Sequence, residues 1–204
     1  MPPPFGGGAG SCFADTTGTT STCNGDGNGL LRYLGSTTGV AYEPWHFWKH
    51  LANSEILPGD FSGYSDNTKC ATDNLCMETG KNTPEGPFRG TGWYVFSVSY
   101  TSFSGRPNNR ERNILVLSNP SNWSGHWNGV SITPSQQYRI DNKLDDGMPY
   151  QGKVVDMSGN FYSPNCATIN SDEFGSEVPG TTSIGATYEL TYTDVACIMF
   201  VDLE

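Results

Sequence analysis

The sequence predicts a loop-rich α+β fold in which helices pack on an antiparallel β-sheet. A helical pattern at residues 44–54 is followed by apolar stretches with the two-residue period of strands, at 92–103 and 113–117. A second helical pattern at 133–144 precedes further short apolar segments. The order helix, strands, helix, strands favours an α+β arrangement.

The composition is that of a globular chain. The 204 residues include 25 Gly and 13 Pro spread along the whole length, with 10 Phe, 10 Tyr and 5 Trp to build a core. This length suits a single domain over residues 1–204. A formal net charge of -10, with only 11 basic residues, argues against nucleic acid or an anionic membrane surface as partner, because both bind clustered Lys and Arg.

The first helix is expected over residues 44–54, within EPWHFWKHLANSEIL. Proline suits the first helical position, where an amide hydrogen would have no partner. Helical spacing places three apolar side chains on one face, Trp45, Trp48 and Leu51. The LPGD stretch at 57–60 then stops the helix.

A β-hairpin is expected next. In GWYVFSVSYTSF (92–103) the two-residue period gives one strongly apolar face that includes Tyr94 and Phe96. RPNN at 106–109 makes a turn, and the apolar run at 113–117 returns as a buried strand. These two strands are therefore predicted to pair antiparallel.

The second helix is expected to begin after Thr133, which is a good N-cap residue, with Pro134 at its first position. Gly147 is placed to end it. Ile140 and Leu144 lie four residues apart, so the pattern predicts that both face the core.

Three short strands are expected after this helix, at 153–157, 187–192 and 196–201. Thr193 and Asp194 separate the last two and suit a tight turn. We therefore expect these two strands to close the sheet as a hairpin.

Six cysteines predict three disulfides in an oxidising compartment. No CxxC pair is present, so neither a zinc ribbon nor a redox motif fits. An even count in a chain rich in Gly, Ser, Thr and Asn suits disulfides, with free thiols as the alternative. The favoured pairs are sequence neighbours: Cys12 with Cys23, Cys70 with Cys76, and Cys166 with Cys197. Residues 2–10 lack the apolar core of a signal peptide, so we expect that a preceding part of the protein is missing from this sequence.

The stretch CNGDGNGLL at 23–31 is the leading candidate metal site. Asn24, Asp26 and Asn28 match the first three ligand positions of a D-x-[DN]-x-[DN]-G calcium loop, and Leu30 is placed to offer its backbone carbonyl. Ca²⁺ prefers oxygen ligands, and the glycines let the chain curl tightly around an ion. The pattern therefore predicts Ca²⁺ as a cofactor.

The match to an EF-hand is incomplete. That motif carries a bidentate Glu at its twelfth position, where this chain has Gly35, and no helix is expected on either side of the loop. Glu43 is the nearest acid downstream and the candidate for the closing ligand. The alternative is a glycine-rich turn that is held by Asx hydrogen bonds without an ion.

A second acidic cluster lies at the end of the second predicted helix, in IDNKLDDG. Asp141, Asp145 and Asp146 would oppose the helix dipole there and need compensation. Hydrogen bonds from the backbone amides of the following loop, an ion pair with Arg139 or Lys143, or a cation would each provide it. The structural interpretation is favoured, and a cation site is the alternative.

Signatures of catalysis are missing from the sequence. His46 and His50 are four residues apart on the first predicted helix, but the Glu of an HExxH site is absent and His126 is the one remaining imidazole. No GxSxG, P-loop or helix-preceding GxGxxG motif occurs. A secreted hydrolase with a close pair of carboxylates stays an alternative, although the sequence singles out no such pair.

The stretch NWSGHWNG at 122–129 is the candidate ligand-binding loop. Trp123 and Trp127 combine aromatic rings with polar neighbours, as sugar-binding platforms do. This makes a carbohydrate-binding adhesin or lectin-like secreted module the alternative function, with a glycan as partner. The simpler interpretation is that both tryptophans belong to the core.

Four segments together resemble the globular part of bacterial type IV pilin-like proteins, the family with a prepilin-type cleavage and methylation N-terminus that is related to the pseudopilins of type II secretion. They follow in the family's order: CNGDGNG at 23–29, WHFWKHLANSEILPGDFSG at 45–63, TPSQQYRIDNKLDDGMPYQGKV at 133–154, and the cysteine-bearing end at 165–200. The third is the most specific, because it is similar to the family's helix ending in ID-x-K-x-DDG-x-P-x-x-G-x-V.

The resemblance implies a structural subunit and not an enzyme. Proteins of this family are inserted in the inner membrane by a long apolar N-terminal helix, processed after a glycine, and assembled with other pilin or pseudopilin subunits. This sequence would then be a soluble headgroup that lacks its helix. The expected location is an extracellular filament or the periplasm, after anchoring in the inner membrane.

Related pseudopilins bind Ca²⁺ in a loop that steadies the headgroup, so the resemblance also implies an ion. In the major pseudopilin that loop lies near the C-terminus, which makes SDEFGSE at 171–177 a rival to the first loop. Its candidate ligands are Asp172, Glu173 and Glu177.

Overall fold

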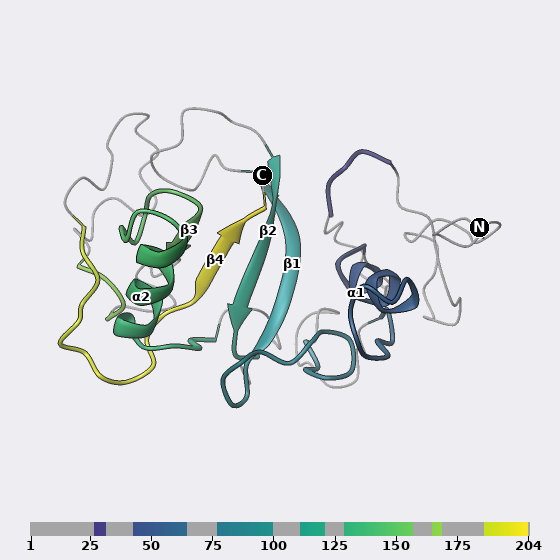
Figure 1. The fold of residues 1–204 in the computed structure, drawn as a ribbon, viewed down its shortest axis with the longest axis horizontal. Coiled ribbons are helices and arrows are strands. Elements are labelled where there is room, and N and C mark those ends of the chain that lie inside the picture. The colour runs from purple at the N-terminus through teal and green to yellow at the C-terminus, as the bar shows by residue number, and fades with distance from the viewer. Residues whose placement is uncertain are drawn as a thin grey trace. The chain divides into compact units, whose positions relative to one another are not determined.

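A computed structural model gives the fold of the chain (Figure 1). It describes residues 27–31, 43–64, 77–99, 111–120, 129–156, 165–168 and 186–203. Along the chain the elements are α1 (Glu43–Asn53), β1 (Gly92–Ser99), β2 (Glu111–Ser118), α2 (Pro134–Leu144), β3 (Val154–Asp156) and β4 (Met199–Asp202). Two helices packed on a four-stranded antiparallel sheet confirm the predicted α+β class.

The four strands are ordered β1-β2-β4-β3, so the last strand of the chain lies in the interior of the sheet. β4 pairs antiparallel with β2, where Leu115 is opposite Val201, and with β3, where Val155 is opposite Phe200. A strand with a partner on each side forms hydrogen bonds along both of its edges. β4 therefore joins two segments that are distant in the sequence.

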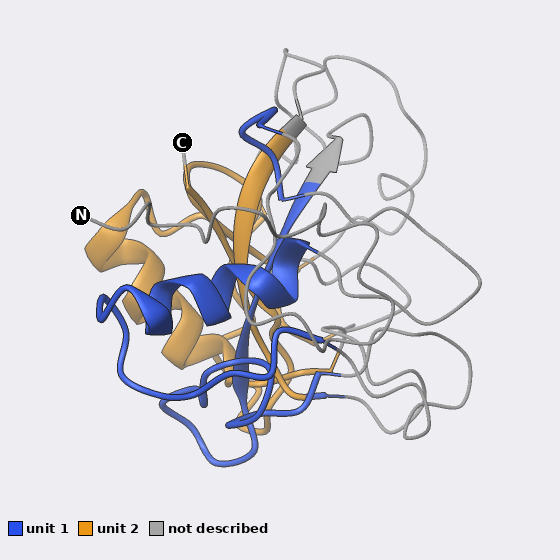
Figure 2. Ribbon diagram, turned by 90° about the vertical axis from the view of Figure 1, so that its right-hand side faces the viewer, with its two compact units in different colours: residues 1–97, 120–127 blue, residues 98–119, 128–204 orange. Residues whose placement is uncertain are grey.

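The chain divides into two compact units (Figure 2). The first comprises residues 1–97 and 120–127 and contains α1 with most of β1, and the second comprises residues 98–119 and 128–204 and contains α2, β2, β3 and β4. A single domain over residues 1–204 stays a prediction. Within the described ranges, neither helix has the length and apolar character that a membrane span requires.

Helix α1 packs by its aromatic side chains. It carries Pro44 in its first turn and lies within one residue of the predicted bounds. Trp45 is fully buried and Trp48 nearly so. The ring of Trp45 lies 5.1 Å from the ring of Tyr94 in β1, measured between centroids. The predicted apolar face is confirmed for both tryptophans, whereas Leu51 is only half-buried.

Strand β1 is buried on both faces, although the sequence pattern predicted one strongly apolar face. Tyr94 and Phe96 are buried, and so are Val95 and Ser97, which alternate with them. The backbone N–H of Ser97 donates to the carbonyl of Leu31 at 2.7 Å. This bond covers part of an edge that would otherwise offer free backbone groups.

Helix α2 begins with a capping box. The Thr133 hydroxyl accepts a hydrogen bond from the backbone N–H of Gln136 (3.2 Å), and the Gln136 side chain accepts one from the backbone N–H of Thr133 (2.9 Å). The predicted N-cap and Pro134 in the first turn are confirmed. Gly147 has a φ of 75° just beyond the end of the helix, a conformation that suits glycine.

The buried face of α2 is polar, which corrects the prediction from its apolar spacing. Gln137 and Asp141 are both 0% exposed, whereas Leu144 is 62% exposed and Ile140 is half-buried. Asp141 finds its partner in Tyr188, which is 47 residues further along the chain. Spacing within the helix does not reveal such a partner, and this is why the predicted face was wrong.

The predicted C-terminal hairpin is also wrong. Residues 187–192 do not form a strand, and Tyr188 makes an isolated bridge with Ala167. Residues 199–202 form β4, which pairs with β2 and β3 instead. Before β4, Cys197 exchanges hydrogen bonds with Ile132. Distant partners thus take the backbone groups that a local hairpin would have used.

Candidate functional site

The end of α2 brings together the three acids of the second predicted site. Carboxylate oxygens of Asp141, Asp145 and Asp146 all lie within 4.8 Å of one another. Asp145 is the C-cap of the helix, and its backbone N–H donates to the carbonyl of Asp141 at 2.6 Å. Burial increases from the exposed Asp146 through the half-buried Asp145 to Asp141.

Backbone amides of the following loop donate to all three carboxylates, which is the first of the compensations that the sequence suggested. The bonds run from Gly147 to Asp141 (3.2 Å), from Met148 to Asp146 (2.8 Å), and to Asp145 from Lys153 and from Val154 (3.1 Å for Val154). Neither Arg139 nor Lys143 forms an ion pair with the cluster in the described part of the chain. The acids therefore fasten the end of α2 to the loop that leads into β3.

The loop approaches Asp145 so closely that it needs a glycine. Gly152 has a φ of 69°, and a Cβ atom there would overlap the carboxylate of Asp145. A side chain at position 152 would thus collide with the carboxylate, apart from the strain of a positive φ. This explains the glycine within the MPYQGKV stretch on structural grounds.

Asp141 is the buried member of the cluster. Its Oδ2 accepts a hydrogen bond of 2.7 Å from the Tyr188 hydroxyl. The pKa of Asp141 is raised to about 6, mainly because the group is buried. The charges of Asp146 and Asp145 also raise it, whereas the hydrogen bonds from Tyr188 and Gly147 lower it. Burial and the Asp141 carboxylate also raise the pKa of Tyr188. At neutral pH the Tyr188 hydroxyl is therefore protonated and acts as a donor.

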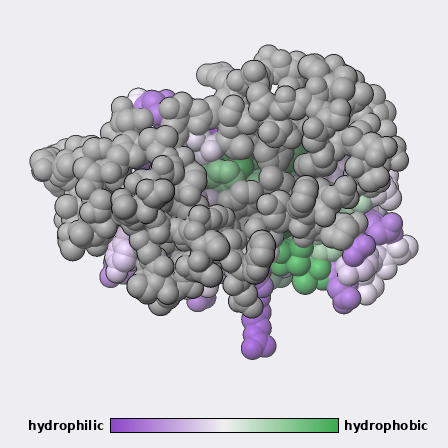
Figure 3. Space-filling view, turned by 180° about the vertical axis from the view of Figure 1, so that it is seen from behind, coloured by the Kyte–Doolittle hydropathy of each residue, from purple (hydrophilic) through white to green (hydrophobic). Residues whose placement is uncertain are grey.

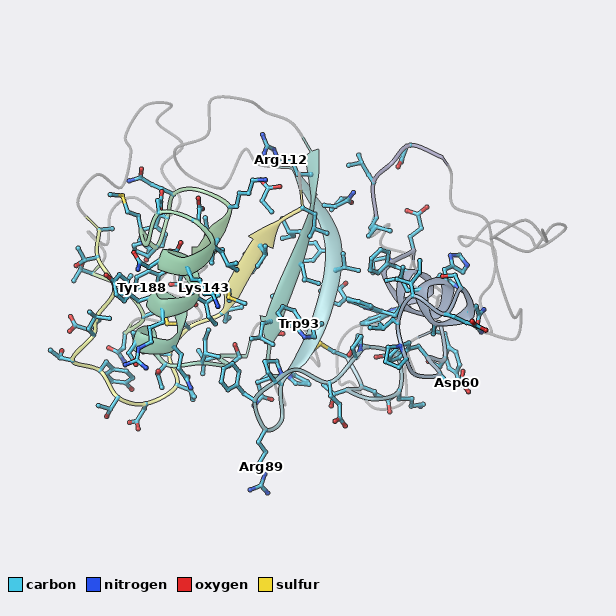
Figure 4. The ribbon with its side chains drawn as sticks, viewed as in Figure 1. Asp60, Arg89, Trp93, Arg112, Lys143 and Tyr188 are labelled. Atoms are coloured by element: carbon cyan, nitrogen blue, oxygen red, sulfur yellow. A yellow bond between two sulfur atoms is a disulfide. The ribbon has the colours of Figure 1, made fainter. Side chains whose placement is uncertain are left out.

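Two residues at this site were not identified from the sequence. Tyr188 is nearly buried and its ring lies 5.9 Å from that of Tyr138 on α2, between centroids. Figure 4 shows it beside the helix. Gln137, one turn before Asp141, is fully buried, and its side chain lowers the pKa of Tyr188. Both lie in segments that carry the family resemblance, but no sequence signal singles out either residue, so only the three-dimensional contacts reveal them.

The first candidate metal loop is described in part. Asn24 and Asp26 lie outside the described residues. The side-chain oxygen of Asn28 accepts a hydrogen bond of 2.7 Å from the backbone N–H of Leu30, which is an Asx interaction. Glu43 is buried in the first turn of α1. The described part thus shows the hydrogen bond expected for a glycine-rich turn, and Ca²⁺ binding stays a prediction.

One predicted disulfide is present among the described residues. Cys166 and Cys197 are bonded and fully buried, with Cα atoms 5.0 Å apart. The carboxylate of Asp156 lies within 4.8 Å of both sulfurs. Because disulfide sulfurs are not thiolates, this group does not offer a metal site. The other candidate pairs, Cys12–Cys23 and Cys70–Cys76, lie outside the described residues.

The predicted histidine pair lies on α1. His46 is buried, and its ring lies 5.9 Å from that of His50 between centroids. Burial lowers the pKa of His50, and the charge of Lys49 adds to this effect. Within the described ranges no Asp, Glu or Cys completes a cluster with them. His126 lies outside those ranges, as do the other candidates: Trp123, Trp127, Asp172, Glu173 and Glu177.

Several apolar side chains reach the surface of the described residues. The exposed ones are Ile56, Tyr138, Leu144, Met148, Leu190, Val195 and Leu203. On the face drawn in Figure 3, apolar residues are visible between hydrophilic ones. Isolated apolar residues are common on protein surfaces, so by themselves they do not identify an interface.

Comparison of the chain with models of known protein families, with curated proteins and with solved structures finds no match.

Proposed function

We propose that this chain is the headgroup of a structural subunit of a type IV pilus-like or pseudopilus filament, outside the cell or in the periplasm. The observation that carries the proposal is the hydrogen-bonded end of α2. Segment 133–154, on which the resemblance is most specific, uses its three carboxylates to hold its own backbone.

A structural role accounts for this use of carboxylates. Each of the three acids accepts at least one backbone hydrogen bond from the loop or from the start of β3. A catalytic acid or base must come within hydrogen-bond distance of its substrate. Asp141 has no exposed surface, so its position suits a structural acid better than a reacting one.

The C-terminal residues support the same role. The disulfide between Cys166 and Cys197 joins positions 31 residues apart, and β4 follows directly in the interior of the sheet. A disulfide of this kind typically adds about 2–4 kcal/mol to the free energy of unfolding. Such a cross-link suits a subunit that works in an oxidising compartment, among other pilin or pseudopilin subunits.

Ca²⁺ is part of this proposal, with Asn24, Asp26, Asn28, the carbonyl of Leu30 and Glu43 as candidate ligands. We expect EDTA to lower the melting temperature by several degrees and added Ca²⁺ to restore it, because an ion that binds only the folded state stabilises it. Asp26→Ala should abolish the response, while Asp194→Ala, which removes an exposed acid elsewhere, should keep it. A melting temperature insensitive to EDTA would refute the ion and leave the filament proposal intact.

The gene and the cell surface provide the decisive test of the filament proposal. The coding region upstream of Pro2 should specify an apolar helix of about 20 or more residues after a glycine processing site. In the natural host, antibodies against the chain should label sheared surface filaments or a periplasmic pseudopilus in electron micrographs. A plain cleavable signal peptide upstream, or a protein found only as a free monomer, would contradict the proposal.

A further inference from the structure

The filament proposal uses the buried carboxyl group of Asp141 as a hydrogen-bond acceptor and does not depend on its protonation state. It is held at two atoms: Oδ1 accepts from the backbone N–H of Gly147 at 3.2 Å, and Oδ2 accepts from the Tyr188 hydroxyl at 2.7 Å. The group lies in the last turn of α2, where the negative end of the helix dipole disfavours a further negative charge.

The charged groups around Asp141 add to this unfavourable environment. Asp145 and Asp146 follow it at the end of α2, with carboxylate oxygens within 4.8 Å. Tyr188, in segment 186–190, faces Asp141. The charge of Asp156 in β3 raises the pKa of the Tyr188 hydroxyl. In the described part of the chain no cationic side chain forms an ion pair with Asp141.

We propose that Asp141 is a proton-binding site of the second unit, which takes up a proton in mildly acidic solution and thereby stabilises the folded end of α2. A neutral carboxyl group removes the repulsion with Asp145 and Asp146 and the cost of a buried charge. It keeps acceptor oxygens for the Gly147 amide and the Tyr188 hydroxyl.

The direction of the pH dependence follows from the pKa of Asp141, which rises from an ordinary value of 3.8 to about 6 in the folded chain, mainly through burial. The folded state therefore binds this proton more tightly than the unfolded state. The stability that the proton contributes is fully present below about pH 4 and is lost as the pH rises through about 6. This dependence is opposite to that of an acid whose pKa is lowered by an ion pair.

Thermal and chemical unfolding at pH 5.0 and pH 7.5 test the proposal on the intact chain. Asp141→Asn cannot titrate, and Asp194→Asn removes the same charge from an exposed position in the same unit. Between the two pH values, the folding equilibrium constant of the wild type should fall about tenfold more than that of Asp141→Asn. Asp194→Asn should behave like the wild type. Parallel profiles for the wild type and Asp141→Asn would overturn the proposal.

Carbon-13 NMR of the aspartate carboxyl groups keeps the proposal testable if Asp141→Asn does not fold. One resonance of the wild-type chain should titrate with a midpoint near pH 6. Tyr188→Phe should move that midpoint to higher pH, because the hydrogen bond from Tyr188 lowers the pKa of Asp141. If Tyr188 only packed against α2, its replacement by Phe would leave this midpoint unchanged. A spectrum in which every aspartate titrates below about pH 5 would refute the proposal.

Discussion

Helices α1 and α2 have the same length, 11 residues, but only α1 buries large aromatic rings, which it does beside the polar Glu43 and His46. α1 buries aromatic rings, Trp45 and Trp48, in the first unit. α2 buries an amide and a carboxylate, Gln137 and Asp141, in the second. Aromatic packing therefore anchors α1 in the first unit, whereas buried polar groups anchor α2 in the second.

The difference has energetic consequences. Burial of a large ring stabilises the folded state roughly in proportion to the apolar area removed from water. This contribution does not depend on one atom of one neighbour. A buried carboxylate requires donors in fixed places, and it destabilises the fold when one of them is lost. We therefore expect α1 to respond to loss of volume, and α2 to loss of single polar atoms.

The largest effect should come from removing a ring of α1. Trp45→Ala should lower the free energy of unfolding by about 3–5 kcal/mol, because it leaves a cavity at a fully buried position next to Tyr94. Denaturation in urea measures the change. The control is Ile56→Ala in the same unit, at a side chain that is 72% exposed, which should change stability by no more than about 0.5 kcal/mol. Equal losses for the two variants would show that burial does not distinguish these positions.

An intermediate effect should come from removing one polar atom at α2. Tyr188→Phe deletes the hydroxyl that donates to Asp141 and leaves the ring in place. We expect a loss of about 1–3 kcal/mol at pH 7.5, where Asp141 is charged and its acceptor becomes unsatisfied. The loss should shrink at pH 5, where the carboxyl group is mostly neutral. A Tyr192→Phe variant, at a half-exposed ring of the same segment, is the matched control. A loss that is equal at both pH values would contradict the role of the charge.

The smallest effect should come from the apolar residue of α2 that the sequence pattern placed in the core. Leu144→Ala should change the free energy of unfolding by no more than about 0.5 kcal/mol, because the side chain is 62% exposed. Ile132→Ala, at a fully buried position just before the same helix, should cost about 2–5 kcal/mol. A comparable cost for Leu144→Ala would show that α2 has an apolar contact, and the contrast with α1 would then be weaker.

Local patterns were sufficient where a residue and its partner are close in the sequence. The Thr133 cap, Pro134 after it and the tryptophans of α1 all depend on spacing within one element. The loop amides that bond the acids at the end of α2 also come from the next few residues or the next strand, and the sequence suggested them as one of three forms of compensation.

Patterns failed where the partner is distant. The strand predicted at 187–192 is absent because Tyr188 pairs with Ala167 and with Asp141, and no local signal identifies either. Leu144 fits a helical stripe, yet it is 62% exposed at the last residue of α2. Both errors have one cause: an apolar period reports that a residue can be buried, not which surface will cover it.

Propensity, capping and periodicity over a few residues were enough to predict the fold class, the start of α2, the buried tryptophans of α1 and the three acids at a helix end. Three features came to light only in the folded chain: β4 lies inside the sheet, α2 buries a polar face, and Tyr188 contacts Asp141. Those features depend on contacts across tens of residues, where the free energy of a buried hydrogen bond or a paired strand edge outweighs local preference.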